Sequence, residues 1–160
     1  MSQSKIEPLL REAFLLAIPA AANLTKFENQ TFDPKGKAKW YGFTYLPNAP
    51  EVATLGSGGQ DRFSGLVQID INIKEGAGKT AVESDVDLLR AVFKAGARLV
   101  NPPAVNVVIK SCGRSGPGFV VDGFYRYPVT VEWETRISRG TPPIGLIHAI
   151  DSEEEEVVSW

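Results

Sequence analysis

Apolar and polar residues alternate strictly over residues 67–73, and this is the clearest strand pattern in the chain. A period of two places one set of side chains in a core and the other on a polar face. The pattern therefore predicts a central strand at Leu66–Ile73. Its apolar set is Val67, Ile69, Ile71 and Ile73, and the facing set is Leu66, Gln68, Asp70 and Asn72.

Two stretches carry apolar residues at helical spacing. The first predicts a helix over Lys5–Ile18, which starts at a Ser4–Glu7 capping box and stops at Pro19. The second predicts a helix that starts with Thr80 as its cap, in a Thr80–Glu83 capping box, and stops at Gly96. Its apolar stripe contains Val82, Val86, Leu89 and Phe93, and Asp85, Asp87, Arg90 and Lys94 lie off that stripe.

The remaining strand signals complete a sheet. Aromatic content or alternation predicts strands at Thr25–Asn29, Lys39–Leu46, Ala104–Lys110 and Tyr127–Ile137, and Phe119–Asp122 is a further candidate. The order is α-β-β-β-α-β-β, with runs of neighbouring strands and two helices. This order predicts an α+β fold of two layers, in which a mainly antiparallel or mixed sheet carries both helices on one face.

A glycine-rich polar loop, ATLGSGGQDRFSG over residues 53–65, leads into the central strand. A loop of this length without secondary structure is usually functional or disordered. It supplies the first candidate site residues, which are Gly56, Gln60, Asp61, Arg62 and Phe63. A second loop is predicted at Ser111–Gly118.

Two more sets of candidates lie on the predicted strands. Glu132 and Glu134 are two residues apart, on the polar face of the last strand, which suits a solvated or intersubunit surface. The strand at residues 39–46 carries aromatic side chains on both faces. One face belongs to the core, and Trp40 on the other packs under a helix or meets another subunit.

Composition narrows the class of protein. The chain has 160 residues, 43% hydrophobic and 22% charged, which is ordinary for a soluble globular protein. We expect one domain over residues 1–137 and an extension over residues 138–160 that contains the acidic run Glu153–Glu156.

A net charge of −2 argues against binding to the phosphate backbone of nucleic acids. We expect no membrane span and no signal peptide, and the lone Cys112 favours a reducing compartment.

The sequence motifs that would indicate an enzyme or a metal site are incomplete in this chain. Gly76–Thr80 reads GAGKT between a strand and a helix, but Ile73 stands where a phosphate-binding loop needs its first glycine. Gly113–Pro117 resembles a nucleophile elbow whose last glycine is replaced by proline, and the only histidine is His148. Cys112 and His148 are too few for a zinc site. We therefore predict no catalytic, cofactor-binding or metal residues, and a small nucleotide-binding enzyme that uses Gly76–Thr80 is the less favoured alternative.

Up to about Ile137 the chain resembles the small tail-terminator proteins of long-tailed bacteriophages. The resemblance rests on the short N-terminal helix, Phe27–Asn29, Phe32–Pro34 and the aromatic strand. It continues through Ala53–Gly56, Asp61-Arg62 and Gly65–Ile71, in the pattern a-t-L-G … D-R … G-x-x-Q-x-D. This signature is structural and carries no catalytic residue. The stretch after Ser138 is not part of the resemblance.

The resemblance implies a structural protein that forms a ring, typically a hexamer. Such a ring caps the tail tube, ends its polymerisation and provides the surface that joins tail to head. The implied partners are further copies of the chain, the major tail-tube protein and a head-tail connector protein, and DNA passes through the lumen without specific binding. The implied location is the virion, with assembly in the host cytoplasm. Another neck, head-tail connector or minor tail subunit is the alternative within the same particle.

Overall fold

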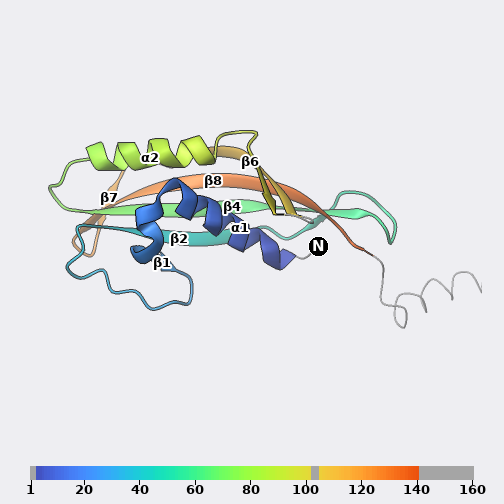
Figure 1. Cartoon of the computed structure of the whole chain (residues 1–160), viewed down its shortest axis with the longest axis horizontal. Coiled ribbons are helices and arrows are strands. Elements are labelled where there is room, and N and C mark those ends of the chain that lie inside the picture. The colour runs from blue at the N-terminus through green and yellow to red at the C-terminus, as the bar shows by residue number, and fades with distance from the viewer. Residues whose placement is uncertain (1–2, 102–104, 141–160) are drawn as a thin grey trace, which may run out of the picture.

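An eight-stranded mixed sheet carries two helices in the computed structural model, which describes residues 3–101 and 105–140 (Figure 1). The strand order is β1-β2-β4-β8-β6-β5, with β3 paired to β4 and β7 paired to β8. Among the described pairs, β1 and β2 run parallel and the others antiparallel. The strands are β1 (Thr25–Phe27), β2 (Lys39–Pro47), β3 (Glu51–Val52), β4 (Gln60–Lys74), β5 (Arg98–Asn101), β6 (Val105–Arg114), β7 (Phe119–Val121) and β8 (Phe124–Ser138).

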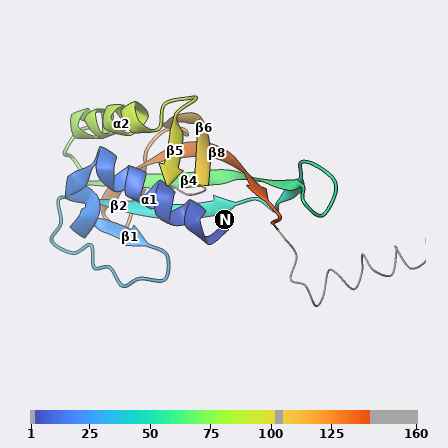
Figure 2. The ribbon, with the colours of Figure 1, turned by 45° about the vertical axis from the view of Figure 1, so that its right-hand side comes forward.

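Both helices lie over the same face of the sheet. They are α1 (Ile6–Ala17), flanked by the 3-10 turns η1 (Gln3–Lys5) and η2 (Pro19–Asn23), and α2 (Thr80–Val92). Tyr41 of β2 contacts both: its ring lies 5.9 Å from that of Phe14 in α1, and its hydroxyl donates a 2.7 Å hydrogen bond to Asp85 in α2. Figures 1 and 2 show the two helices next to each other on this side.

The core lies between the helices and the central strands. The predicted alternation in β4 is confirmed, because Val67, Ile69 and Ile71 are fully buried and Ile73 nearly so. They face the apolar stripes of the helices together with side chains from three other strands of the sheet. These are Tyr41 and Phe43 of β2, Val107 and Ile109 of β6, and Tyr127, Val129, Val131 and Trp133 of β8. The opposite face, here called the open face, carries mostly polar side chains.

The predicted fold class is confirmed, and the predicted order is roughly matched. Two strands exceed their predicted bounds because pairing with β8 extends them past their apolar centres. In β4, Gln60–Phe63 are strand residues and not loop, since Gln60 pairs with Ser138. In β6, Ser111–Arg114 were predicted as loop but continue the ladder beyond a bulge near Lys110, with Cys112 opposite Val131. The sequence prediction missed β3 and β5.

The second helix required two corrections. Thr80 is its first helical residue, whereas the N-cap position is Lys79, whose side chain makes no capping hydrogen bond. Asp85, placed off the apolar stripe by sequence, is buried at 5% exposure because it lies one turn from both Val82 and Leu89. It accepts hydrogen bonds from Tyr41 and Lys39, so the buried face of α2 contains a charge with two partners.

Within the described part of the chain, no helix combines the length and hydrophobicity needed to cross a bilayer. The sequence predictions for residues 141–160, including the acidic run and His148, lie outside the described residues.

Candidate assembly surfaces

A β-hairpin that projects past the helices contains half of the candidate residues. We call residues 51–62 the arm: β3 pairs with the start of β4, with Glu51 opposite Arg62 and Val52 opposite Asp61. The carbonyl of Gln60 accepts hydrogen bonds from the amides of Ala53 and Thr54, at 2.9 and 3.0 Å. The arm extends beyond the end of α1, to the right in Figure 1. Strand residues therefore form the base of the arm, and residues 53–59 form the predicted loop at its tip.

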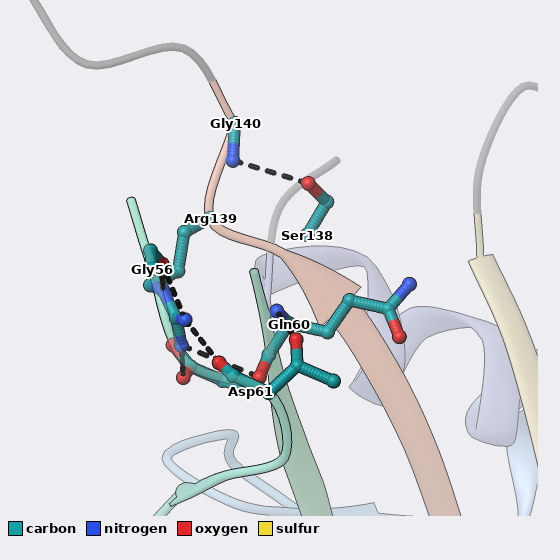
Figure 3. A network of polar contacts seen from close by, with 7 residues as sticks. Gly56, Gln60, Asp61, Ser138, Arg139 and Gly140 are labelled. Carbon is teal, nitrogen blue, oxygen red and sulfur yellow. Dashed lines mark hydrogen bonds and ion pairs between the residues drawn. The ribbon is translucent and has the colours of Figure 1, made fainter. Parts of the chain in front are cut away.

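Arg139, which follows β8, holds the tip of the arm (Figure 3). Its Nε and Nη2 donate to the carbonyl of Gly56, at 3.2 and 2.6 Å, and Nη2 also donates to the carbonyl of Thr54. Its Nη1 donates to the carbonyl of Gln60, at 3.3 Å, and forms an ion pair with the Asp61 carboxylate. One guanidinium thus satisfies three carbonyls and one carboxylate, an arrangement that its planar set of donors allows.

Two glycines of the arm are explained by this arrangement. Gly56 has φ of +93°, a left-handed conformation that side chains disfavour. At Gly59 a Cβ atom would collide with the carbonyl oxygens of Thr54 and Leu55 and with the Arg139 guanidinium. Because the main chain of Arg139 also donates to the Gly59 carbonyl, at 2.9 Å, the tip and the end of β8 are tied together twice.

The other loop candidates have separate environments. Arg62 forms an ion pair with Glu51 across the arm, with both side chains more than a third exposed. Phe63 is half-buried and packs against the core cluster. Gln60 is exposed. The structure therefore brings together Gly56, Gln60 and Asp61 around Arg139, and it places Arg62 and Phe63 outside that network.

Glu132 and Glu134 lie on the open face of β8, as their spacing predicted, next to Lys110 of β6. The Lys110 ammonium is 3.5 Å from Glu134 and 4.0 Å from Glu132, and the Ser111 hydroxyl donates to Glu132 at 3.4 Å. The side chains of Lys110 and Glu132 are each 48% exposed. These contacts form a solvated polar patch on the open face.

Trp40 is covered from within the chain. Its ring lies 5.4 Å from that of Phe32 and meets the Phe124 ring edge-on at 5.8 Å, so it is only 7% exposed. Packing within the subunit therefore accounts for this aromatic residue, and a role for it between subunits stays a prediction.

The segment of the nucleotide-binding alternative is a tight turn from β4 to α2. Gly76 and Gly78 have φ of +83° and +76°, which the turn requires of them. Together with Lys79, Tyr125 and Tyr127 they line a hollow of about 340 Å³. Among the described residues, no three His, Cys, Asp or Glu side chains cluster closely enough to hold a metal ion.

The sequence offered no signal for Arg139, which lies in the stretch set apart as an extension. It offered only a weak signal for Asp85, whose helical spacing from Val82 and Leu89 matches the apolar stripe.

Burial, the hydrogen bond to Asp85 and the nearby Asp85 charge all raise the pKa of Tyr41 above its usual range. The hydroxyl thus stays a donor, and the buried carboxylate keeps its partner.

Comparison with known proteins identifies the family whose model matches this chain and solved structures that share its fold. A family model described as "Phage tail terminator protein" matches residues 5–133. Twelve solved chains match. One of them superposes with a TM-score of 0.60 at 17% identity, over 86% of this chain and 97% of that chain. At this identity the likeness shows the fold alone. No curated protein matches.

Proposed function

The chain belongs to the phage tail terminator family, and we propose that it forms a ring that caps the tail tube, ends its polymerisation and offers the surface to which the head attaches. Family membership makes the protein a structural component of phage tail assembly. The match over residues 5–133, which spans both helices and the central strands, is the observation that carries this proposal.

The architecture supports an assembly role in two ways. First, the arm is an ordered projection held by Arg139, and an ordered projection loses little conformational entropy when it meets a partner. Second, the open face of the sheet carries polar side chains over its central strands, so it suits a hydrated contact or a channel wall. The proposed partners are further copies of the chain, the major tail-tube protein and a head-tail connector protein, with DNA passing through the ring.

The ring is proposed to be a hexamer. The proposal is tested by the mass of the full chain, measured by light scattering alone and after mixing with purified tail tubes. We expect a single ring mass, either free at high concentration or bound to tube ends. A chain that stays at the monomer mass of 17.4 kDa and leaves tube ends bare would contradict the proposal.

A second test concerns the arm. Removal of residues 56–60, combined with Asp61→Ala and Arg62→Ala, is expected to abolish either ring formation or tail joining. If both processes survive, the arm is not an assembly surface. Asp87→Ala is the matched control, because it removes an exposed charge on α2, outside both the arm and the open face.

A further inference from the structure

The arm presents apolar side chains that stay exposed among the described residues. Leu55 is 90% exposed and Val52 is 65% exposed. Both lie on the segment that Arg139 and the Gln60 carbonyl hold in place. An exposed leucine on an ordered hairpin loses water-exposed apolar area on docking, at a small ordering cost.

A groove between α1 and β5 offers a matching surface. It has a volume of about 520 Å³, and its walls are mainly apolar side chains from the two elements. At its margins Leu16 is 74% exposed and Val100 is 58% exposed. The other apolar side chains that line it are Leu9, Ala13, Leu15 and Leu99.

Charges on the groove complement those on the arm. Glu12 of α1 and Arg98 of β5 line the groove, and neither forms an ion pair with another described residue. The arm carries Glu51 and Arg62, which pair with each other beside Val52, and Asp61, which pairs with Arg139. On docking, Glu51 and Arg62 can exchange their mutual ion pair for Arg98 and Glu12 of the second copy, and such complementarity favours one docking orientation.

We propose that the arm of one subunit docks in the α1–β5 groove of a second copy, with Leu55 between Leu16 and Val100. In Figure 1 the arm lies beyond the end of α1. Arm and groove are different patches, so the contact is head-to-tail, and head-to-tail contacts generate rings when the rotation closes. This inference rests on the proposed ring and names the contact that builds it.

Cysteine cross-linking tests the contact directly. The full chain carries Cys112→Ser, which removes its only native thiol, together with Leu55→Cys and Leu16→Cys. Under mild oxidation, free at high concentration and on tail tubes, we expect disulfide-linked dimers and larger oligomers. The matched control pairs Leu55→Cys with Leu88→Cys, which is 46% exposed on α2, and is expected to give no such ladder.

A charge at the tip gives an independent readout. Leu55→Asp is expected to raise the protein concentration at which half of the chains are in rings by about tenfold or more. Leu88→Asp is expected to leave that concentration unchanged. Both sites are exposed, so the fold tolerates either change.

Rings of the expected mass that give no Leu55–Leu16 link would overturn this contact and leave the proposed function standing. The same holds for a Leu55→Asp variant that forms rings normally but fails to bind purified tail tubes, because the arm would then contact the tube protein. If the unmodified chain forms no ring, alone or on tubes, the proposed function fails and the contact fails with it.

Discussion

At the scale of single residues, Arg139 does more for the candidate surface than any residue that the sequence singled out. All three guanidinium nitrogens donate to the arm, and the side chain is 26% exposed. Hydrogen bonds from a charged donor stabilise by about 1.5–3 kcal/mol when well shielded, and partial exposure lowers that figure. The order of the arm thus depends on a residue about 80 positions away in sequence.

Gly59 provides a residue-scale prediction with an internal control. Gly59→Ala is expected to lower the free energy of unfolding by about 1–3 kcal/mol, because its Cβ would press on two carbonyl oxygens of the arm. Gly58→Ala has open space around the new methyl group and is expected to change stability by less than about 0.5 kcal/mol. Urea denaturation of both variants measures the difference, and equal midpoints would contradict the packing described for the tip.

The environment of Tyr45 predicts how the stability of the fold changes at alkaline pH. Burial, with a smaller contribution from the Glu7 charge, raises its pKa to about 12. Its ring stacks on Trp133 at 5.7 Å. Since a tyrosine of the unfolded chain ionises near pH 10, the unfolded state releases its proton first, and stability falls as the pH rises from about 10 to 12. Urea midpoints across this range are expected to fall less steeply for Tyr45→Phe than for the unmodified protein. Identical slopes would show that Tyr45 has no such shift.

At the scale of elements, the arm is expected to loosen when its clamp is removed. Arg139→Ala leaves the carbonyls of Thr54 and Gly56 without their guanidinium donor. Native-state hydrogen exchange at the amides of Ala53 and Thr54 is then expected to accelerate about tenfold, while the amides of β8 keep their protection. Arg136→Ala is the control, because Arg136 lies on the exposed side of β8. Unchanged exchange in the arm would contradict the role assigned to Arg139.

Helix α2 is held to the sheet by a polar contact as well as by its apolar stripe. Asp85→Ala is expected to cost about 2–3 kcal/mol, because it leaves the buried Tyr41 hydroxyl and the Lys39 ammonium without their acceptor. Asp87→Ala changes an exposed carboxylate on the same helix and is expected to have an effect within about 0.5 kcal/mol. Similar losses from both substitutions, measured by urea denaturation, would rule out the buried contact as the cause.

Elements with a dense apolar pattern were predictable from sequence, and elements defined by pairing were not. The periods of Val67–Ile73 and Val82–Leu89 reflect burial of one face, so they are visible in the residues themselves. The strand residues Gln60–Phe63 and Arg98–Asn101 have few apolar side chains, and their conformation follows from neighbours distant in sequence, such as Ser138 and Val108. The same limit applies to the site: Gly56, Gln60 and Asp61 were candidates, but their common partner Arg139 was not.

At the scale of the whole molecule, the two faces of the sheet differ in what they can contact. The helices cover one face and form the core, whereas the open face holds Lys110 among Glu132 and Glu134. The four most exposed large apolar side chains of the described residues lie on the arm and at the α1–β5 groove, and further exposed ones lie on β7, β2, β4 and α2. A molecule with separate complementary patches is suited to head-to-tail assembly, which is what a ring requires.

The central claim is that this protein ends the growth of the tail tube, and tail length measures it most directly. Particles made by phage that lack the protein are examined by electron microscopy, with the unmodified gene supplied in trans as the control. Overlong tails without heads are expected, and they return to a uniform length on complementation. Detached tails of normal length would contradict this role and indicate a neck protein that acts after the tube is complete.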